Sequence, residues 1–250
     1  MKFALINNEK SEATKGARGL CPVCGSELIA KCGELKINHW AHKGNRNCDP
    51  WWENETAWHR SWKDKFPEEW QEVIQFDKNG EKHIADVKTE NGWVIEFQHS
   101  YLKPEERRSR NAFYNKLIWV VDGTRRKRDT EQFSKTLNIS TPSGGKSKIW
   151  RVHSHECKLL REWEDSHTPV FLDFGGDKLW WLLENASNGV VYIAPVPRDY
   201  FVEVHVDSEK KKARDFDEFV GDIGKLITNY ESAFRSFTKG KDFRSNKSRR

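Results

Sequence analysis

The stretch that decides the fold is HIADVKTENGWVIEFQHS, residues 83–100, which reads as two strands joined by a short turn. Apolar and polar residues alternate in both halves, as they do in strands that bury one face. The turn at residues 90–92 sets the register. A two-residue turn would place Asp86 and Glu96 on opposite faces, whereas a three-residue loop with a left-handed Gly92 pairs them. A metal site at these two acids therefore requires the three-residue loop.

Asp86, Glu96 and Gln98 are predicted to share one face of this strand pair, because residues two apart in a strand point the same way. Such a set is weak evidence by itself, since charged side chains are common on the solvent face of a hairpin. His83, three residues before Asp86, is a candidate proton carrier, and a surface or structural histidine is the alternative.

A helix is predicted over WWENETAWHRSWKDKF, residues 51–66, with Glu55 and His59 on its aromatic face. A carboxylate placed against a core needs a partner, which is either a metal ion or a neighbour such as His59 or Lys63. Together with the strand acids, Glu55 gives an oxygen-rich ligand set suited to Mg²⁺ or Mn²⁺. An ion there would polarise a phosphodiester and lower the pKa of a bound water.

Four of the five cysteines lie between Cys21 and Cys48, which is unlike the disulfide framework of a secreted protein. Cys21-Pro-Val-Cys24-Gly is a zinc-knuckle pattern, in which two thiolates on a tight turn hold one tetrahedral ion. The second ligand pair is predicted to be His42 and Cys48, with His39 as the competitor of His42. Four protein ligands would make the site structural, and a set of free thiols is the alternative.

The 250 residues are polar, with 32% charged residues, a mean hydropathy of −0.87 and a net charge of +5. No apolar run approaches the roughly 18 residues of a membrane helix, so we expect a cytoplasmic protein without membrane contact. Residues 238–250 carry six basic residues and one acidic residue, which equals the whole net charge. The cluster of Arg107, Arg108 and Arg110 is a candidate nucleic-acid contact, and a solvated face is the alternative.

Further elements follow from pattern. A helix is predicted from Pro104 to about Lys116, followed by the buried strand LIWVV. Residues 123–148 are predicted as a long exposed connection, because their composition turns to Arg, Lys, Ser, Thr and Gly. In the second half, VFLDFG, KLWWLLE, VVYIAPV and YFVEVHV are predicted as strands of a small sheet. A helix with apolar residues at helical spacing is predicted between Phe216 and Phe234.

In order and spacing, a succession of motifs resembles the competence protein CoiA-like family of nucleases. The motifs are CPVCG, HWAHKGNRNC, ENETAWHRSWK, IADV, IEFQHS and RSRNAFY, the last of them before LIWVV. That family is assigned to the PD-(D/E)XK superfamily, and the resemblance covers residues 15–122. It implies an α/β fold with a restriction-endonuclease-like core. The predicted units are a zinc-knuckle module at 1–49, the PD-(D/E)XK-like core at 50–149, a C-terminal α+β accessory region at 150–237 and a basic disordered tail at 238–250.

The resemblance also implies roles for individual residues. Four residues take the family's catalytic positions, namely Asp86 for the motif aspartate, Glu96 for the second acid, Gln98 for the lysine and Glu55 for the acid of the N-terminal helix. Arg110 and Tyr114 resemble the family's arginine and tyrosine, which can steady a phosphate and the site. Gln98 can only hydrogen-bond, whereas a lysine orients water and offsets phosphate charge. Glutamine is nevertheless the usual residue at this place in the CoiA-like pattern.

The leading hypothesis is a metal-dependent DNA endonuclease or exonuclease with structural Zn²⁺ and catalytic Mg²⁺ or Mn²⁺, acting in competence, DNA processing or phage defence. DNA is the expected partner, and a protein such as an ATPase is a second candidate. The alternative is a nucleic-acid-binding or partner-binding module that keeps the nuclease scaffold without cleaving, which the glutamine in place of lysine leaves open. A zinc-containing transcription regulator would leave the acids unexplained.

Overall fold

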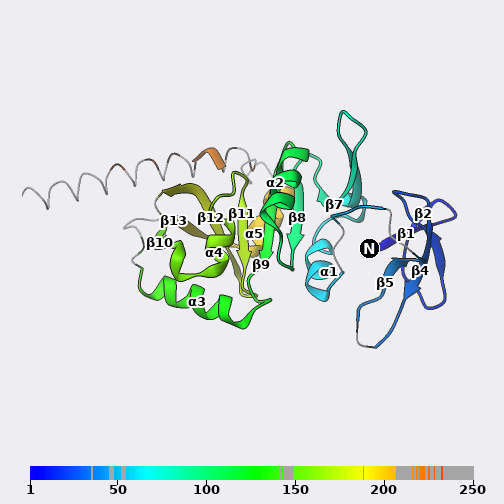
Figure 1. Cartoon of the computed structure of the whole chain (residues 1–250), viewed down its shortest axis with the longest axis horizontal. Coiled ribbons are helices and arrows are strands. Elements are labelled where there is room, and N and C mark those ends of the chain that lie inside the picture. The colour runs from blue at the N-terminus through cyan, green and yellow to red at the C-terminus, as the bar shows by residue number, and fades with distance from the viewer. Residues whose placement is uncertain are drawn as a thin grey trace, which may run out of the picture.

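The chain is described by a computed structural model over residues 1–34, 36–44, 48–51, 55–140, 142, 149–187 and 189–206, with residues 216, 218, 220–222, 225, 228 and 232. The described strands form two sheets, one in an N-terminal module and one in the rest of the chain (Figure 1). None of the described helices combines the length and the apolar character that crossing a membrane requires.

The N-terminal sheet has five antiparallel strands in the order β2-β1-β3-β4-β5. The strands are β1 (Phe3–Ile6), β2 (Glu9–Glu12), β3 (Arg18–Leu20), β4 (Glu27–Lys31) and β5 (His39–His42). Leu28 and Trp40 are fully buried at the centre of its small core. Ile74 and Ile84 of the second sheet pack against this core, so apolar contacts join the module to the rest of the protein.

The second sheet has eight strands in the order β10-β13-β12-β11-β9-β8-β7-β6. The strands are β6 (Gln71–Phe76), β7 (Lys82–Lys88), β8 (Val94–Gln98), β9 (Leu117–Asp122), β10 (Trp150–His153), β11 (Val170–Asp173), β12 (Lys178–Ser187) and β13 (Val190–Pro197). Strand β9 is parallel to both of its neighbours, β8 and β11. The sheet therefore runs without a break across the predicted boundary at 149–150. The predicted core and accessory region share one sheet, because β11 adds directly to β9.

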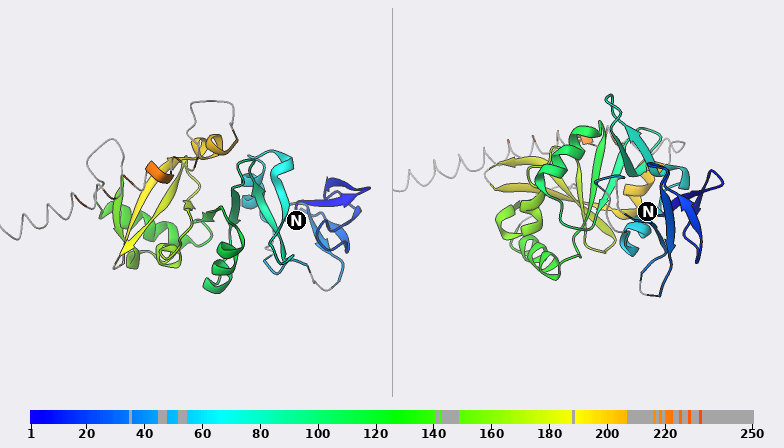
Figure 2. Two further views of the ribbon diagram at one scale, coloured as in Figure 1. Left: turned by 90° about the horizontal axis from the view of Figure 1, so that it is seen from above. Right: turned by 45° about the vertical axis from the view of Figure 1, so that its right-hand side comes forward.

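Helices cover both faces of this sheet, as the left view of Figure 2 shows for the yellow-orange α5 and the green α3 and α4. The helices are α1 (Ala57–Lys63), α2 (Pro104–Phe113), α3 (Lys127–Asn138), α4 (Lys158–Trp163) and α5 (Arg198–Val206), with short 3-10 turns at Glu68–Trp70 and Ser154–Glu156. Trp62 of α1 and Phe201 of α5 pack with Phe97 on one face. Trp163 of α4 packs on Trp119 on the other face.

Two predicted elements of the chain have a different structure. Helix α3 lies inside the predicted exposed connection, because Phe133 and Thr136 bury one face of a segment whose composition is polar. The segment YFVEVHV forms part of α5 rather than a strand. Its buried residues, Phe201, Val204 and His205, are spaced three and four apart, which is the period of a helix and not of a strand.

The predicted helix over residues 51–66 is shorter than expected. It begins at Ala57 because Thr56 caps it, its hydroxyl accepting the N–H of His59 at 3.2 Å. Glu55 therefore precedes the helix. Three predicted segments lie outside the described residues: residues 52–54 of this helix, most of the helix predicted between Phe216 and Phe234, and the tail at 238–250.

Candidate active site and zinc site

Four side chains with metal-ligand chemistry come together in the N-terminal module. The ligand atoms of Cys21, Cys24, His42 and Cys48 all lie within 4.8 Å of one another. The Cys24 Sγ is 3.4 Å from His42 Nε2, and the Cys21 Sγ is 3.5 Å from Cys48 Sγ. The turn between the first two cysteines closes at Gly25, which has a φ of +70°. This Cys₃His group can hold a metal ion such as zinc.

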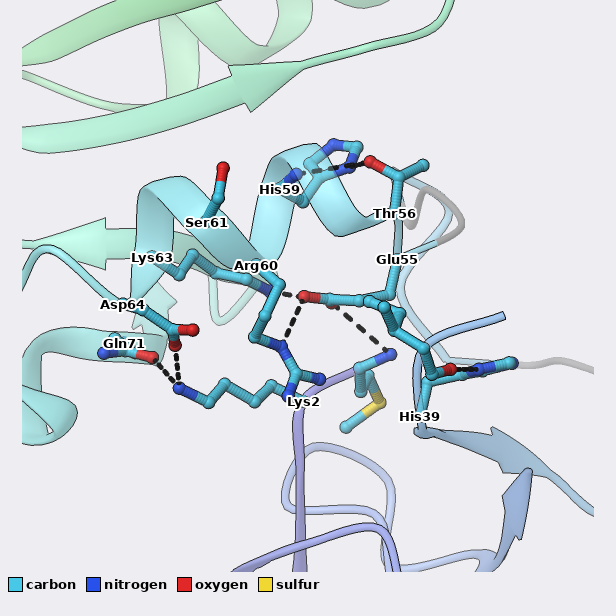
Figure 3. Close-up of polar contacts among 12 residues, drawn as sticks. Lys2, His39, Glu55, Thr56, His59, Arg60, Ser61, Lys63, Asp64 and Gln71 are labelled. Carbon is cyan, nitrogen blue, oxygen red and sulfur yellow. Dashed lines mark hydrogen bonds and ion pairs between the residues drawn. The ribbon is translucent and has the colours of Figure 1, made fainter. Parts of the chain in front are cut away.

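His39 does not belong to this group, which corrects its candidacy as a ligand. His39 and His42 are three residues apart on β5, so their side chains point to opposite faces of the sheet. The Nδ1 of His39 lies 2.9 Å from the carbonyl oxygen of Ile37 instead (Figure 3).

The thiols of this group differ in acidity. Burial raises the pKa of the Cys48 thiol to about 12, and the neighbouring Cys21 adds to that effect. Burial also opposes ionisation of Cys24, but hydrogen bonds with Ser26 and His42 lower its pKa to about 6. A metal ion bound by all three thiolates must therefore displace protons, so its affinity falls on acidification.

The turn between β7 and β8 has the three-residue form that a shared acid face requires. The N–H of Thr89 donates to the carbonyl of Trp93 at 2.9 Å across the loop. Gly92 has a φ of +80°, in the left-handed region. Val87 pairs with Ile95 and Lys88 with Val94, which is the register that a metal site requires and which sets Asp86 and Glu96 on one face.

Asp86 and Glu96 line a common cavity of about 60 Å³. The charged residues of its lining are Asp49, Glu55, Glu72, Asp86, Glu96, Lys63 and Arg110, together with Met1, which carries the α-amino group. His59, Trp51, Ile84 and Phe97 complete the lining. One water needs roughly 10–15 Å³ of such space, so the cavity can take an ion with a few waters.

Lys63 is 1% exposed and lies among three of these acids. Its Nζ is 2.7 Å from Glu55 Oε2, as Figure 3 shows, 3.0 Å from Glu72 Oε1 and 3.9 Å from Asp86 Oδ1. Burial by itself lowers the pKa of a lysine, but the three carboxylates outweigh it and raise the pKa of Lys63 above its usual range. Lys63 is therefore a fixed cation at neutral pH.

From its helical spacing, Lys63 was expected only as a pairing partner of Glu55. A signal for its place in the cavity was present, because Lys63 follows His59 by one helical turn and so shares its face. What the sequence did not show is that Glu72, on a strand, comes to the same ammonium group.

One carboxylate oxygen of Glu96 lacks a hydrogen-bond partner within the described part of the chain. Its Oε2 is 3.2 Å from Arg110 NH1, but its buried Oε1 finds no hydrogen-bond partner among the described residues, and neither does the Tyr114 hydroxyl. Burial, and then the charge of Asp86, raises the pKa of Glu96 to about 8, although Arg110 acts in the opposite direction. An unpartnered carboxylate oxygen beside a second carboxylate fits a bound cation and its waters.

Asp86 occupies the point where β7 and β8 separate. Its Oδ2 accepts the backbone N–H of Phe97 at 2.9 Å, in place of a strand-to-strand hydrogen bond. Burial raises the pKa of Asp86, while Lys63 acts to lower it. Among the described residues, the Cys₃His group is the one set of three or more such side chains whose spacing could hold a metal ion, and the acids of the cavity do not form a second one.

Gln98 and His83 do not line the cavity. The amide nitrogen of Gln98 donates to the carbonyl of Ser100 at 3.1 Å. His83 precedes Asp86 by three residues in β7 and so faces the other way, with its Nδ1 2.8 Å from Asp49 Oδ1. The imidazole in the cavity is that of His59.

Two arginines of the predicted basic cluster are buried. The guanidinium of Arg107 contacts the Asp165 carboxylate and the Glu162 carbonyl, and Arg110 faces the cavity. These two side chains, three apart on α2, form the inward face of the helix. Arg108 alone of the three is exposed. Arg107 is therefore a structural side chain and not the nucleic-acid contact that its position in the sequence indicated.

The N-terminal part of the chain is similar to known proteins. Residues 5–50 match the family model described as the N-terminal domain of competence protein CoiA. A stretch of 57 residues is 42% identical to competence protein CoiA of Bacillus subtilis (strain 168), covering 23% of this chain and 15% of that protein. No solved structure matches the chain. The family match falls on the five-stranded module with the Cys₃His group, and this part of the chain is similar to the N-terminal domain of competence protein CoiA.

Proposed function

We propose that this protein is a metal-dependent nuclease that cleaves phosphodiester bonds in DNA, with the cavity around Asp86 and Glu96 as its active site. The observation that carries the proposal is the meeting of these acids and Glu55 with a buried lysine, from segments far apart in the sequence. A restriction-endonuclease-like core belongs to the same proposal. Burying this many charges is costly, and a structural core seldom requires it.

Asp86 and Glu96 are the proposed ligands of Mg²⁺ or Mn²⁺. Their oxygens are hard ligands, and the Oε1 of Glu96, which has no hydrogen-bond partner among the described residues, can coordinate the ion. When bound, such an ion would polarise the phosphodiester and supply a water of lowered pKa. Arg110 holds the second oxygen of Glu96 and so keeps that carboxylate oriented.

Lys63 supplies the positive charge that Gln98 cannot. Its ammonium group lies in the cavity and stays protonated, so it offsets phosphate charge and does not act as a base. Gln98 turns its amide to Ser100 instead. The imidazole of His59 lines the same cavity and is the proposed proton carrier, in place of His83.

The test is cleavage of supercoiled, linear and single-stranded DNA, and of RNA, by the purified full chain with Mg²⁺ or Mn²⁺. Asp86→Asn and Glu96→Gln should each lower the cleavage rate by at least about 100-fold. Glu90→Gln, an exposed acid in the turn of the same hairpin, is the matched control and should cleave like wild type. Ca²⁺ in place of Mg²⁺ serves as a control for binding without catalysis.

Two outcomes would contradict the proposal. Cleavage that survives Asp86→Asn would come from a contaminating nuclease or from another site. DNA binding without cleavage under every metal would favour the alternative, a binding module on a nuclease scaffold.

A further inference from the structure

Glu72 of β6 has a backbone conformation that a side chain rarely adopts. Its φ is +48°, although it lies inside a strand and is not a glycine. The pairs on either side, Gln71 with Val87 and Val73 with Ala85, keep one register. Strained residues persist where the surrounding structure holds them, and they gather at functional sites.

The Glu72 carboxylate holds two parts of the protein together. Its Oε1 accepts the backbone N–H of Lys2 at 2.6 Å, and its Oε2 accepts that of Phe3 at 3.0 Å. The same Oε1 is 3.0 Å from the Nζ of Lys63. One buried side chain thus joins the start of the N-terminal module, which carries the Cys₃His group, to the lysine of the cavity.

Other polar contacts fix the module against β6 beside Glu72. The Nζ of Lys2 is 2.9 Å from Gln71 Oε1 and 2.5 Å from Asp64 Oδ1, as Figure 3 shows. The Nζ of Lys10 donates to the Gln71 carbonyl at 2.8 Å. The module therefore forms a wall of the cavity and is not a separate appendage.

A second anchor starts next to a cysteine of the metal group. Asp49 directly follows Cys48, and its Oδ2 accepts the backbone N–H of Ile84 at 2.8 Å. Ile84 is two residues from Asp86 on β7. The N-terminal module is thus attached both to β6, which carries Glu72, and to β7, which carries Asp86.

Lys63 has three carboxylates within reach, and their distances decide which of them it neutralises. Glu55 and Glu72 hold its Nζ by hydrogen bonds, which leaves Asp86 at 3.9 Å. Without the Glu72 carboxylate, the ammonium group would move toward Asp86 and form a full ion pair there. That ion pair would compete with a divalent cation for the same oxygen.

We propose that Glu72 is a positioning residue, which couples the packing of the N-terminal module against β6 to the position of Lys63 and so keeps Asp86 available to a divalent cation. The inference rests on the proposed function for the use of that cation. It adds that the module takes part in building the active site.

The experiment measures Mn²⁺ binding to the zinc-loaded full chain by electron paramagnetic resonance of free Mn²⁺. Glu72→Gln should weaken Mn²⁺ binding by at least about tenfold, whereas Glu69→Gln, an exposed acid just before β6, should leave it within about twofold of wild type. In a Lys63→Met background the competing cation is gone, so adding Glu72→Gln should change Mn²⁺ affinity by less than about twofold. Zinc content and the thermal unfolding midpoint are recorded for each variant.

This double-mutant cycle of Glu72→Gln and Lys63→Met distinguishes a role of Glu72 in positioning Lys63 from a general structural role. If Glu72→Gln binds Mn²⁺ like wild type, or weakens it equally with and without Lys63, the inference is overturned. If Glu72→Gln does not fold, Lys2→Met tests the same coupling, because it releases Gln71 and Asp64 but leaves the Glu72 carboxylate intact. It should weaken Mn²⁺ binding by about two- to fivefold, and no change would also overturn the inference.

Cleavage by the same preparations distinguishes the two proposals. Wild-type protein that binds Mn²⁺, responds to Glu72→Gln and cleaves nothing would refute the nuclease function but leave the positioning role of Glu72 in place. Wild-type protein that cleaves DNA, with Mn²⁺ binding indifferent to Glu72, would do the opposite. A cavity that binds no Mn²⁺ would refute both.

Discussion

Binding of Mn²⁺ in the cavity is expected to release a proton from Glu96. Burial and the charge of Asp86 raise the pKa of Glu96 to about 8 in the cation-free protein. Below that pH the ion must displace a proton from Glu96, so the Mn²⁺ affinity falls about tenfold for each unit by which the pH is lowered. Between a plateau above pH 8 and pH 6, the Mn²⁺ affinity should therefore fall by about 100-fold. Glu96→Gln should bind Mn²⁺ more weakly and lose most of this dependence.

The same pKa predicts how the stability of the cation-free protein changes with pH. The pKa of Glu96 rises from 4.5, its ordinary value, to about 8 on folding, so the native state holds the extra proton between those values. The stability from this group is fully present below pH 4.5 and is lost as the pH rises through 8, by about 1.4 kcal/mol per unit. From pH 6 to pH 8 the loss is about 2 to 3 kcal/mol, and Glu96→Gln should not show it.

The assay is a calorimetric titration of Mn²⁺ into zinc-loaded protein at pH 6, 7 and 8, in two buffers of different ionisation enthalpy. The difference between the buffers gives the number of protons released, which should approach one at pH 6 and 7. Glu90→Gln is the control and should behave like wild type. A constant affinity from pH 6 to pH 8 with no proton released would refute the reasoning about Glu96.

Further predictions concern the metal group, the lysine and the basic residues. The wild-type chain should carry about one equivalent of zinc by elemental analysis, and Cys24→Ser should lose it together with the folding of the module, so retained zinc would contradict the site. Lys63→Met should lower the cleavage rate by at least about 100-fold with a smaller change in DNA affinity, and equal losses in both would point to a binding role. Arg107→Gln should destabilise the fold by about 3 kcal/mol in chemical denaturation, because Arg107 is buried. The exposed Arg108 should behave differently: Arg108→Gln should change stability by less than about 0.5 kcal/mol and weaken DNA binding. The reverse pattern would contradict the burial of Arg107 and the exposure of Arg108. Removal of the residues after Phe237 should reduce DNA affinity and its salt dependence, and unchanged binding at low and moderate salt would contradict a role for that basic segment.

The sequence by itself predicted those features that depend on short-range spacing. The strand pair followed from alternation, because a strand has a period of two, and the sequence left open a two-residue or a three-residue turn with Gly92 in the left-handed region. The cysteines of the metal group followed from the spacing of Cys21 and Cys24 on one turn. His42 and His39 are three residues apart on a strand and so face opposite ways, but the two could be told apart only once β5 was known.

Features that join distant segments were decided only by the tertiary structure. No local pattern shows that β11 adds to β9, so nothing in the sequence places both halves of the chain in one sheet. Segment YFVEVHV alternates like a strand, yet packing of Phe201 on the sheet makes it a helix. The place of Lys63 depends on Glu72, whose carboxylate is held by backbone N–H groups about 70 residues earlier in the chain. Charge and burial act through space, so these partners become neighbours only when the module and the sheet have packed together.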